Sequence, residues 1–129
     1  MKTIREVAET FKLTPRTLRY YEEIGLLSPI RTETNQRLYD KKEIAKIKLI
    51  ERGKRYNFNL DEIKEMILLF DTDRSGKAQL KRTIEYGKEK KREINERMKE
   101  LQEIKREITE LERLFIQRIK EIEKEEEIK

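Results

Sequence analysis

The 129-residue sequence contains no cysteine and no histidine. These two absences exclude disulfide bonds, thiolate or imidazole metal sites and acid–base catalysis by histidine. Long apolar runs are missing as well: residues 1–6 do not begin a secretory signal, and no segment approaches the roughly 20 apolar residues that span a membrane. We therefore expect a cytoplasmic protein that has no metal site, no cofactor and no membrane partner.

Apolar residues are scarce and charged residues abundant. Hydrophobic residues make up 35% of the chain and charged residues 46%, which is too polar for a large globular core. Such a balance is typical of disorder or of a long exposed helix, and the two differ in periodicity. Residues 1–60 carry 14 Lys/Arg against 8 Asp/Glu, whereas residues 61–129 carry 18 against 19. This asymmetry indicates that the first half binds a polyanion.

Two short helices are predicted near the amino end. Thr3 and Glu6 form a capping box, in which hydroxyl and carboxylate satisfy free amide groups at a helix start. Thr14 as N-cap and Pro15 at the first helical position begin the second helix, which would end at Gly25 in the left-handed conformation. Because only about three residues separate the two helices, the pattern predicts a helix-turn-helix.

A β wing and two further helices follow. Pro29 and the polar run 32–35 interrupt the helical pattern, and residues 37–39 are predicted to form a strand, so that strand, turn and strand make a wing. The pairs Asp40–Glu43 and Asn59–Glu62 form two more capping boxes. Each pair precedes apolar residues at helical spacing, namely Ile44, Ile47, Ile50, Ile63, Met66, Ile67 and Phe70.

From about Ser75 the sequence predicts one long helix with a narrow apolar stripe. One helix of ~45 residues would extend ~68 Å, far more than a small head can cover, so the stripe needs a partner helix. The apolar spacing departs from strict heptads at Leu101–Ile104–Ile108 and at Phe115–Ile119. An intramolecular hairpin is disfavoured, because residues 88–129 contain no turn signal. We expect a homodimer paired through Ile94, Met98, Leu101, Ile108, Leu111 and Phe115.

The run TPRTLRYYEEIGLL at residues 14–27, followed by RLY at residues 37–39, resembles the mercury-resistance-regulator (MerR) family. The likeness covers about residues 3–70. Within the family, residues 48–71 are most similar to the branch that controls leucine, isovalerate and related acyl-CoA breakdown. The resemblance implies a mainly α fold, with a winged helix-turn-helix DNA-binding head at 1–72 and a long dimerisation helix at 73–129 that forms an antiparallel coiled coil.

The resemblance also implies a function. Such a protein is a sequence-specific transcription regulator that binds double-stranded DNA at a pseudo-palindromic operator as a homodimer. It would distort promoter DNA and thereby act on RNA polymerase indirectly. The family often has glycine in three turns where this chain has Lys12, Asn35 or Gln36, and Asn57. Asparagine tolerates the left-handed conformation, so we expect modest strain only at Lys12.

Specific DNA contacts follow from the position of each residue in the motif. Arg16 and Thr17, at the start of the second helix, would face base edges in the major groove. Arg19 and Tyr20, about one turn further, suit phosphate oxygens, whereas Tyr21 would pack inward with Leu18. The remaining predicted backbone contacts are Arg37 and Tyr39 on the wing, Lys54, and the helix start at Asn59.

Other interpretations stay open. The arginines could be ordinary solvated surface charges, and residues 88–92 could be a second nucleic-acid patch, although a solvated face with i,i+4 pairs is the simpler interpretation. The chain could be an architectural or recombination-accessory DNA-binding protein, or a coiled-coil adaptor whose head binds protein. An enzyme is the weakest choice, because the sequence has no His, no Cys and no glycine-rich phosphate loop.

Overall fold

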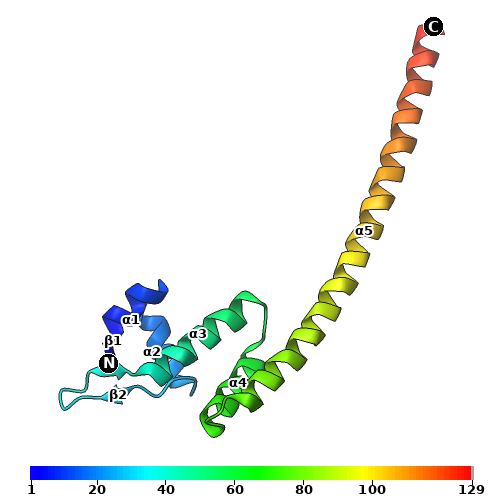
Figure 1. Cartoon of the computed structure of the whole chain (residues 1–129). Coiled ribbons are helices and arrows are strands. Elements are labelled where there is room, and N and C mark those ends of the chain that lie inside the picture. The colour runs from blue at the N-terminus through cyan, green and yellow to red at the C-terminus, as the bar shows by residue number, and fades with distance from the viewer. Residues whose placement is uncertain (129) are drawn as a thin grey trace. The chain divides into compact units, whose positions relative to one another are not determined.

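The computed structural model describes residues 1–128 and is mainly helical, as predicted (Figure 1). Contacts divide the chain into two units, Met1–Thr83 and Ile84–Lys129. The first unit, here called the head, holds every element except most of the last helix. The helices are α1 (Ile4–Phe11), α2 (Pro15–Glu23), α3 (Lys41–Arg55), α4 (Leu60–Thr72) and α5 (Lys77–Ile128), and the strands are β1 (Lys2–Thr3), β2 (Ile30–Arg31) and β3 (Arg37–Tyr39).

Polar side chains cap the amino ends of the head helices at the positions that the sequence predicts. The Thr3 hydroxyl accepts a hydrogen bond from the Glu6 N–H at 3.2 Å, and the Glu6 carboxylate accepts one from the Thr3 N–H at 3.1 Å. Asn59 and Glu62 exchange the same pair of bonds at the start of α4. Thr14 caps α2, with Pro15 in its first turn. The predicted capping boxes of α1 and α4 are therefore confirmed.

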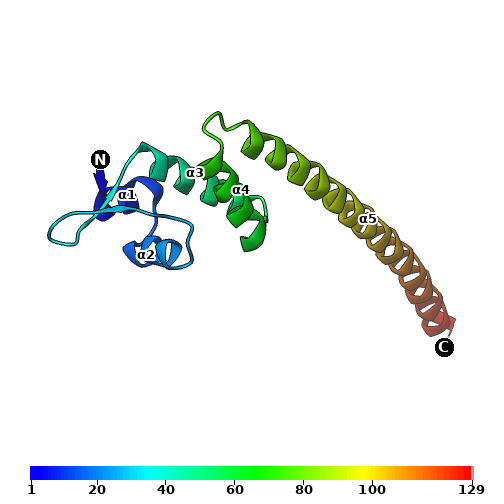
Figure 2. The same ribbon diagram turned by 90° about the horizontal axis from the view of Figure 1, so that it is seen from below.

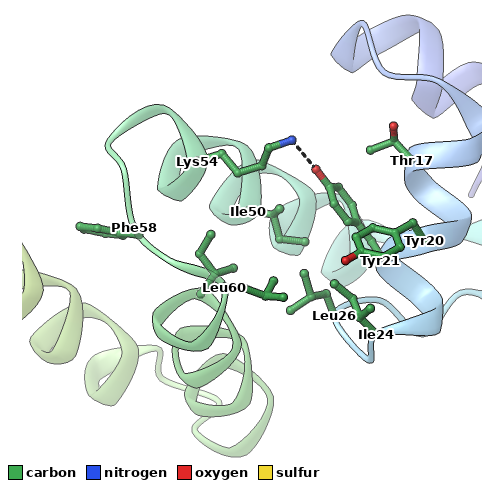
Figure 3. A pocket seen from close by; sticks show the side chains of 10 residues that line it. Thr17, Tyr20, Tyr21, Ile24, Leu26, Ile50, Lys54, Phe58 and Leu60 are labelled. Carbon is green, nitrogen blue, oxygen red and sulfur yellow. Dashed lines mark hydrogen bonds between the residues drawn. The ribbon is translucent and has the colours of Figure 1, made fainter.

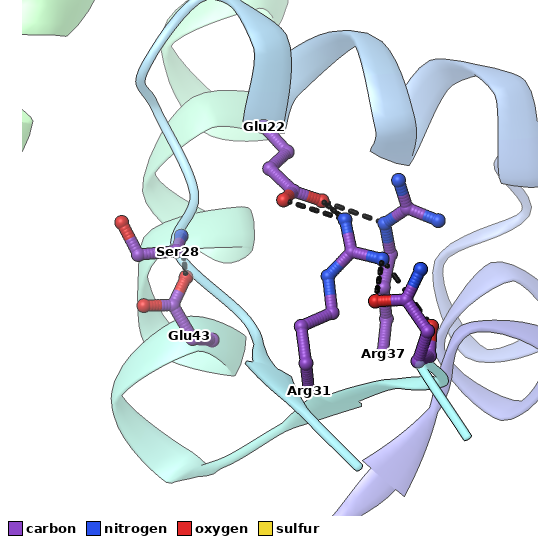
Figure 4. Close-up of polar contacts among 6 residues, drawn as sticks. Glu22, Ser28, Arg31, Arg37 and Glu43 are labelled. Carbon is purple, nitrogen blue, oxygen red and sulfur yellow. Dashed lines mark hydrogen bonds and ion pairs between the residues drawn. The ribbon is translucent and has the colours of Figure 1, made fainter. Parts of the chain in front are cut away.

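The predicted capping box of α3 is only half correct. Asp40 accepts a hydrogen bond from the Glu43 N–H at 2.9 Å, as expected of an N-cap. The Glu43 carboxylate, however, accepts from the Ser28 N–H at 3.0 Å (Figure 4) and from Lys46 Nζ at 3.2 Å. Because Glu43 is buried, its carboxylate binds the loop that follows α2 instead of the exposed end of α3.

Three turns place non-glycine residues in the left-handed region. Lys12 has φ 55°, Asn35 φ 64° and Asn57 φ 62°. These are the positions where the sequence analysis expected glycine-like turns, with Asn35 rather than Gln36 at the wing. The asparagines accept this conformation readily, whereas the left-handed conformation of a lysine reduces the stability of the fold by about 1–2 kcal/mol. The head thus carries local strain at the turn between α1 and α2.

A three-stranded antiparallel sheet forms the wing, in the order β1–β3–β2. Arg31 pairs with Arg37 across the hairpin, and Lys2 pairs with Tyr39 on the other edge of β3. The sequence predicts the hairpin but misses β1, because two residues ahead of a helix cap have no strand periodicity. The pairing of β1 holds the amino end of the chain against the wing.

One apolar core fills the head. Its buried residues lie on the inner faces of α1 to α4, on β3 and in the turn after α2, where Leu26 and Leu27 lie. Helices α3 and α4 lie side by side (Figure 2), and Gly53 lets them approach closely. A Cβ atom at Gly53 would lie 2.9 Å from Cγ1 of Ile63, too close for an undisturbed contact. The largest fully buried side chains are Tyr39, Leu18, Leu26, Leu27, Ile47, Ile50, Met66 and Val7.

Helix α5 is a single uninterrupted helix of 52 residues (Figures 1 and 2). At 1.5 Å per residue it extends roughly 78 Å, longer than expected. Its Leu, Ile, Met and Phe residues are exposed, and the described part of α5 has no buried residue. Every seventh position forms one regular series, interrupted only at Gly87: Leu80, Ile94, Leu101, Ile108, Phe115 and Ile122. No helix within residues 1–128 is long and apolar enough to cross a membrane.

Candidate nucleic-acid interface

Helix α2 has one buried face and one charged, exposed face. Leu18 is fully buried and Tyr21 is 4% exposed, so these two side chains anchor the helix in the core. Arg16, Arg19 and Tyr20 point away from that core, and Tyr20 is 50% exposed. The predicted division between an inward Tyr21 and an outward Tyr20 is confirmed. Three predicted contact residues therefore share a surface on which they can reach a polyanion.

Thr17 lies at the edge of this surface and is partly committed to the helix cap. Its hydroxyl lies 2.9 Å from the Thr14 hydroxyl, and its N–H donates to the same Thr14 oxygen at 3.1 Å. A hydroxyl can form more than one hydrogen bond. Thr17 can therefore still contact a base edge through its methyl group or its remaining hydrogen-bonding capacity.

The wing carries two arginines that share one carboxylate of α2. Arg37 Nε lies 2.6 Å from Glu22 Oε1, and a terminal nitrogen of Arg31 lies 2.9 Å from Glu22 Oε2 (Figure 4). Partial burial opposes charge on Glu22, but the hydrogen bonds from Arg37 and Arg31 outweigh it and lower the pKa of Glu22. Figure 4 shows the terminal nitrogens of Arg37 pointing away from Glu22. Glu22 thus orients Arg37 while leaving part of its guanidinium available.

Arg31 is a candidate contact residue that the sequence analysis missed. Besides Glu22, it contacts the backbone and side-chain oxygens of Asn35 at 3.3 Å. It pairs with Arg37 across the hairpin and so places a second arginine beside Arg37 on the wing. The signal that could have found it was its place on the strand opposite Arg37, since residues paired across a hairpin lie side by side.

Lys54 is held in place by Tyr21. The Tyr21 hydroxyl accepts a hydrogen bond from Lys54 Nζ at 2.8 Å (Figure 3) and donates one to Glu51 at 2.9 Å. Nζ also lies 5.5 Å from the centre of the Tyr21 ring. The hydrogen bond with Tyr21 is the main reason why the pKa of Lys54 is raised. Lys54 therefore presents a positive charge beside α2 at neutral pH.

Tyr39 does not fit the role that the sequence predicted for it. Its side chain is 0% exposed, and its hydroxyl has no hydrogen-bond partner among residues 1–128. Burial also raises the pKa of this hydroxyl. Tyr39 lies on β3 and faces the core, because side chains alternate along a strand and its neighbour Leu38 is only partly covered. The expected phosphate contact of Tyr39 is therefore corrected to a packing role.

Asn59 is positioned at the start of α4, but its amide oxygen is already used. It accepts a hydrogen bond from the Glu62 N–H at 2.8 Å. Asp61 and Glu62 add negative charge to the first turn. These carboxylates would oppose a phosphate at this helix start, so any DNA contact of Asn59 would have to use its remaining amide group.

The predicted pairing residues lie exposed along α5, from Ile94 to Phe115. Their exposed fractions range from 49% for Leu111 to 61% for Phe115. In the same part of the chain, positive and negative side chains form ion pairs one turn apart, including Arg97 with Glu100 and Arg113 with Glu110. Within residues 1–128, no group of three or more His, Cys, Asp or Glu side chains is arranged to hold a metal ion.

Comparisons with known proteins agree with this geometry. A family model described as MerR HTH family regulatory protein matches residues 2–68, and one described as MerR, DNA binding matches residues 44–111. The HTH-type transcriptional regulator CueR of Salmonella typhi is 37% identical over 95 residues, which cover 72% of this chain and 69% of CueR.

Two solved structures are similar as well. HiNmlR, a MerR family regulator lacking the sensor domain and bound to promoter DNA, is 25% identical with a TM-score of 0.58, covering 78% of this chain and 77% of that one. A MerR family transcriptional regulator from Listeria monocytogenes has a TM-score of 0.67 at 22% identity, covering 84% and 83%, and supports the fold alone.

Proposed function

This chain belongs to the MerR HTH family of DNA-binding transcriptional regulators, and on that premise we propose that two copies bind and distort a pseudo-palindromic promoter operator. The observation that carries the proposal is the exposed face of α2, where Arg16, Arg19 and Tyr20 lie opposite the buried Leu18 and Tyr21. The relatives are regulators and not enzymes. The proposal is tested by selecting DNA fragments with the purified protein and then footprinting the protein on them. Hypersensitive positions at the operator centre are expected, and a uniform footprint would contradict distortion.

Each contact residue has a separate role in this proposal. Arg16 reads a base edge in the major groove, where arginine can bind guanine O6 and N7 together. Arg19 and Tyr20 hold phosphates about one turn along α2. Arg37 and Lys54 grip the flanking backbone, held in position by Glu22 and Tyr21 respectively. We assign residues 1–72 to the DNA-binding domain and residues 73–129 to the dimerisation segment, most of which is α5.

Members of this family bind promoter DNA as dimers, and we infer that the α5 stripe is the pairing surface. The charges of α5 support an antiparallel arrangement. Residues 77–92 carry seven Lys/Arg against two Glu, whereas residues 121–128 carry five Glu against one Lys. Antiparallel helices bring each acidic end beside the partner's basic segment, whereas parallel helices align like charges. A helix of roughly 78 Å is many times the Debye length of about 8 Å, so only the antiparallel arrangement pairs these opposite charges.

Cross-linking tests the arrangement cleanly, because the chain has no cysteine of its own. Chains carrying Ile84→Cys and chains carrying Ile122→Cys are mixed and treated with a bis-maleimide linker, which tolerates a shift of a few residues. Antiparallel pairing links the two different chains, and neither variant links to itself. Self-links in both variants would show a parallel pair instead.

The pairing surface itself is tested by substitution. Ile108→Asp with Leu111→Asp is expected to give monomers that bind DNA poorly, measured by sedimentation and gel shift. Arg106→Asp is the matched control, because it adds the same charge on the opposite face of the helix. Compact wild-type monomers in sedimentation would contradict the dimer.

Three finer points stay predictions. The likeness of residues 48–71 to regulators of leucine, isovalerate and acyl-CoA breakdown predicts the controlled genes, and a genome-wide occupancy map tests this. The same map separates a regulator from an architectural DNA-binding protein, because regulators concentrate at promoters. A cytoplasmic location and an indirect action on RNA polymerase through promoter DNA follow from the proposed partner.

A further inference from the structure

The head contains a half-open apolar cavity of about 290 Å³. It lies between α2, α3 and α4, beside the exposed face of α2 (Figure 3). Its floor consists of the buried residues Tyr21, Leu26, Ile50 and Ile63. Its walls and rim are formed by Thr17, Tyr20, Ile24, Lys54, Phe58 and Leu60.

The lining of this cavity combines aliphatic carbon with one positive charge. Lys54 is the one charged residue among the ten that line the cavity. Lys54 Nζ is oriented by the Tyr21 hydroxyl at 2.8 Å, and Glu51, outside the lining, lies 3.8 Å from Nζ. A lysine ammonium can donate three hydrogen bonds. An anion at the rim would therefore find an ammonium that is already positioned and only partly balanced.

We propose that this cavity binds a small aliphatic monocarboxylate, with its carboxylate on Lys54 Nζ and its hydrocarbon chain on Ile24, Leu26 and Ile63. Ligand pockets typically have volumes of about 300–1,000 Å³, so this cavity suits only a small ligand. Each additional buried CH₂ group should raise affinity about fourfold. Affinity should therefore increase from butyrate to hexanoate to octanoate, and it should stop increasing once the chain exceeds the cavity.

Such a ligand would release DNA, an inference that rests on the proposed function. Thr17, Tyr20 and Lys54 line the cavity and also belong to the proposed DNA surface. A carboxylate on Lys54 would occupy the ammonium that the proposed function assigns to a phosphate. Ligand and operator should therefore compete, and each should lower the affinity of the other by the same factor.

Methyl NMR of the free full-length protein tests the cavity without any DNA. Three isoleucines line it, Ile24, Ile50 and Ile63, so their ¹³C-labelled δ1 methyl resonances should shift saturably as octanoate is added. Ile47 and Ile67 are buried in the same head but do not line the cavity, and their resonances should stay in place. Absence of a saturable shift, or equal shifts along the isoleucines of α5, would overturn the proposal.

Substitution separates the carboxylate contact from the apolar one. Lys54→Met should weaken octanoate binding about tenfold or more and leave octanol binding unchanged, because only the acid uses the charge. Lys48→Met, an exposed lysine of the same helix, is the matched control and should change neither. Ile24→Phe fills the cavity from a partly exposed position and should abolish the octanoate shifts. Unchanged octanoate affinity in both Lys54→Met and Ile24→Phe would overturn the site.

Operator DNA then tests the regulatory part. The operator-bound protein should show no octanoate shifts at Ile24, Ile50 and Ile63, and octanoate should lower operator affinity. If octanoate binds the free protein but leaves operator affinity unchanged, the proposed competition is wrong. If the protein binds no operator at all, the proposed function fails, while the methyl shifts of the free protein still decide whether the cavity binds a carboxylate.

Discussion

Glu22, in the last turn of α2, lies 2.6 Å from Arg37 of β3 and so joins α2 to the wing. Both side chains are about three-quarters covered. An ion pair of this kind constrains a wing arginine that would otherwise be mobile. The two elements that carry the proposed DNA contacts are therefore positioned relative to each other by a side chain that is not itself expected to touch DNA.

Glu22→Gln should loosen the wing. The variant should lose about 1 kcal/mol of stability and bind operator several-fold more weakly, because charge-assisted hydrogen bonds to both arginines are lost. Since the folded pKa of Glu22 is lowered, its contribution is present above about pH 4.3 and disappears as pH falls through the folded pKa. Urea unfolding measured across the acid range checks this. Glu23→Gln, an exposed neighbour, should change neither property.

Specificity and affinity should divide among the basic residues. Arg16→Ala should cost about 1–3 kcal/mol on the operator and relax preference at one position per half-site. Arg19→Ala and Arg37→Ala should weaken all DNA sequences alike and reduce the slope of log K against log salt. Arg92→Ala, on α5, is the control. A slope reduced by Arg92→Ala but not by Arg19→Ala would place the DNA surface on α5.

Tyr39→Phe should leave DNA binding unchanged. The buried hydroxyl lacks a hydrogen-bond partner within residues 1–128, so its removal spares a desolvation cost of about 1–3 kcal/mol. We expect unchanged operator affinity and unfolding at an equal or higher urea concentration. Tyr39→Ala is the contrasting variant and should destabilise the head by about 3–5 kcal/mol through a core cavity. A loss of operator affinity in a stably folded Tyr39→Phe would restore the phosphate contact.

Lys12→Gly should stabilise the head slightly. Relief of the left-handed strain is worth of order 1–2 kcal/mol, and the added flexibility of the unfolded chain removes about half of it. Thermal unfolding should therefore show a net gain of up to about 1 kcal/mol. Glu9→Gly, an exposed position inside α1, should instead cost about 1 kcal/mol. A destabilised Lys12→Gly would mean that the lysine side chain itself stabilises the turn.

Lys46 should be essential for folding stability. It is 3% exposed and lies 2.9 Å from Asp71 and 3.2 Å from Glu43. Lys46→Met leaves the Glu43 carboxylate buried without its cation and should cost about 3 kcal/mol or more. Lys42→Met removes a half-exposed partner of Asp71 and should cost less than about 1 kcal/mol. Equal costs for the two would contradict the importance of burial.

The ion pairs of Lys46 with Asp71 and Glu43 make the stability of the head depend on pH in a defined direction. Burial of Lys46 and of Asp71 opposes both charges, but their mutual hydrogen bond and the contacts with Glu43 and Lys42 together outweigh it, so the pKa of Lys46 is raised and that of Asp71 lowered. The contribution of Asp71 is lost as pH falls below about 4, and that of Lys46 is lost as pH rises above about 10.4. Lys46→Met should remove the contribution of Lys46 to the alkaline loss of stability and reduce the acid loss that comes from Asp71.

Local features of the head were predictable because their causes are local. Capping residues such as Thr3 and Asn59, the outward Tyr20, and the left-handed turns at Lys12 and Asn57 depend on side chains within a few positions of each other. Helix and turn geometry determine which neighbours can meet, so a sequence pattern suffices. Periodicity likewise predicts that α5 is one long helix with an exposed stripe.

Contacts between distant segments were decided by the tertiary structure. Glu43 bonds Ser28 instead of completing a capping box, Tyr39 turns into the core, and Tyr21 of α2 holds Lys54 of α3. A sequence pattern states which residues are polar or apolar, but not which partner burial brings within hydrogen-bonding distance. Burial makes an unpaired charge or hydroxyl costly, so the folded chain selects partners that are remote in sequence. The cavity beside Lys54 arises in the same way, because its walls come from three helices that only packing brings together.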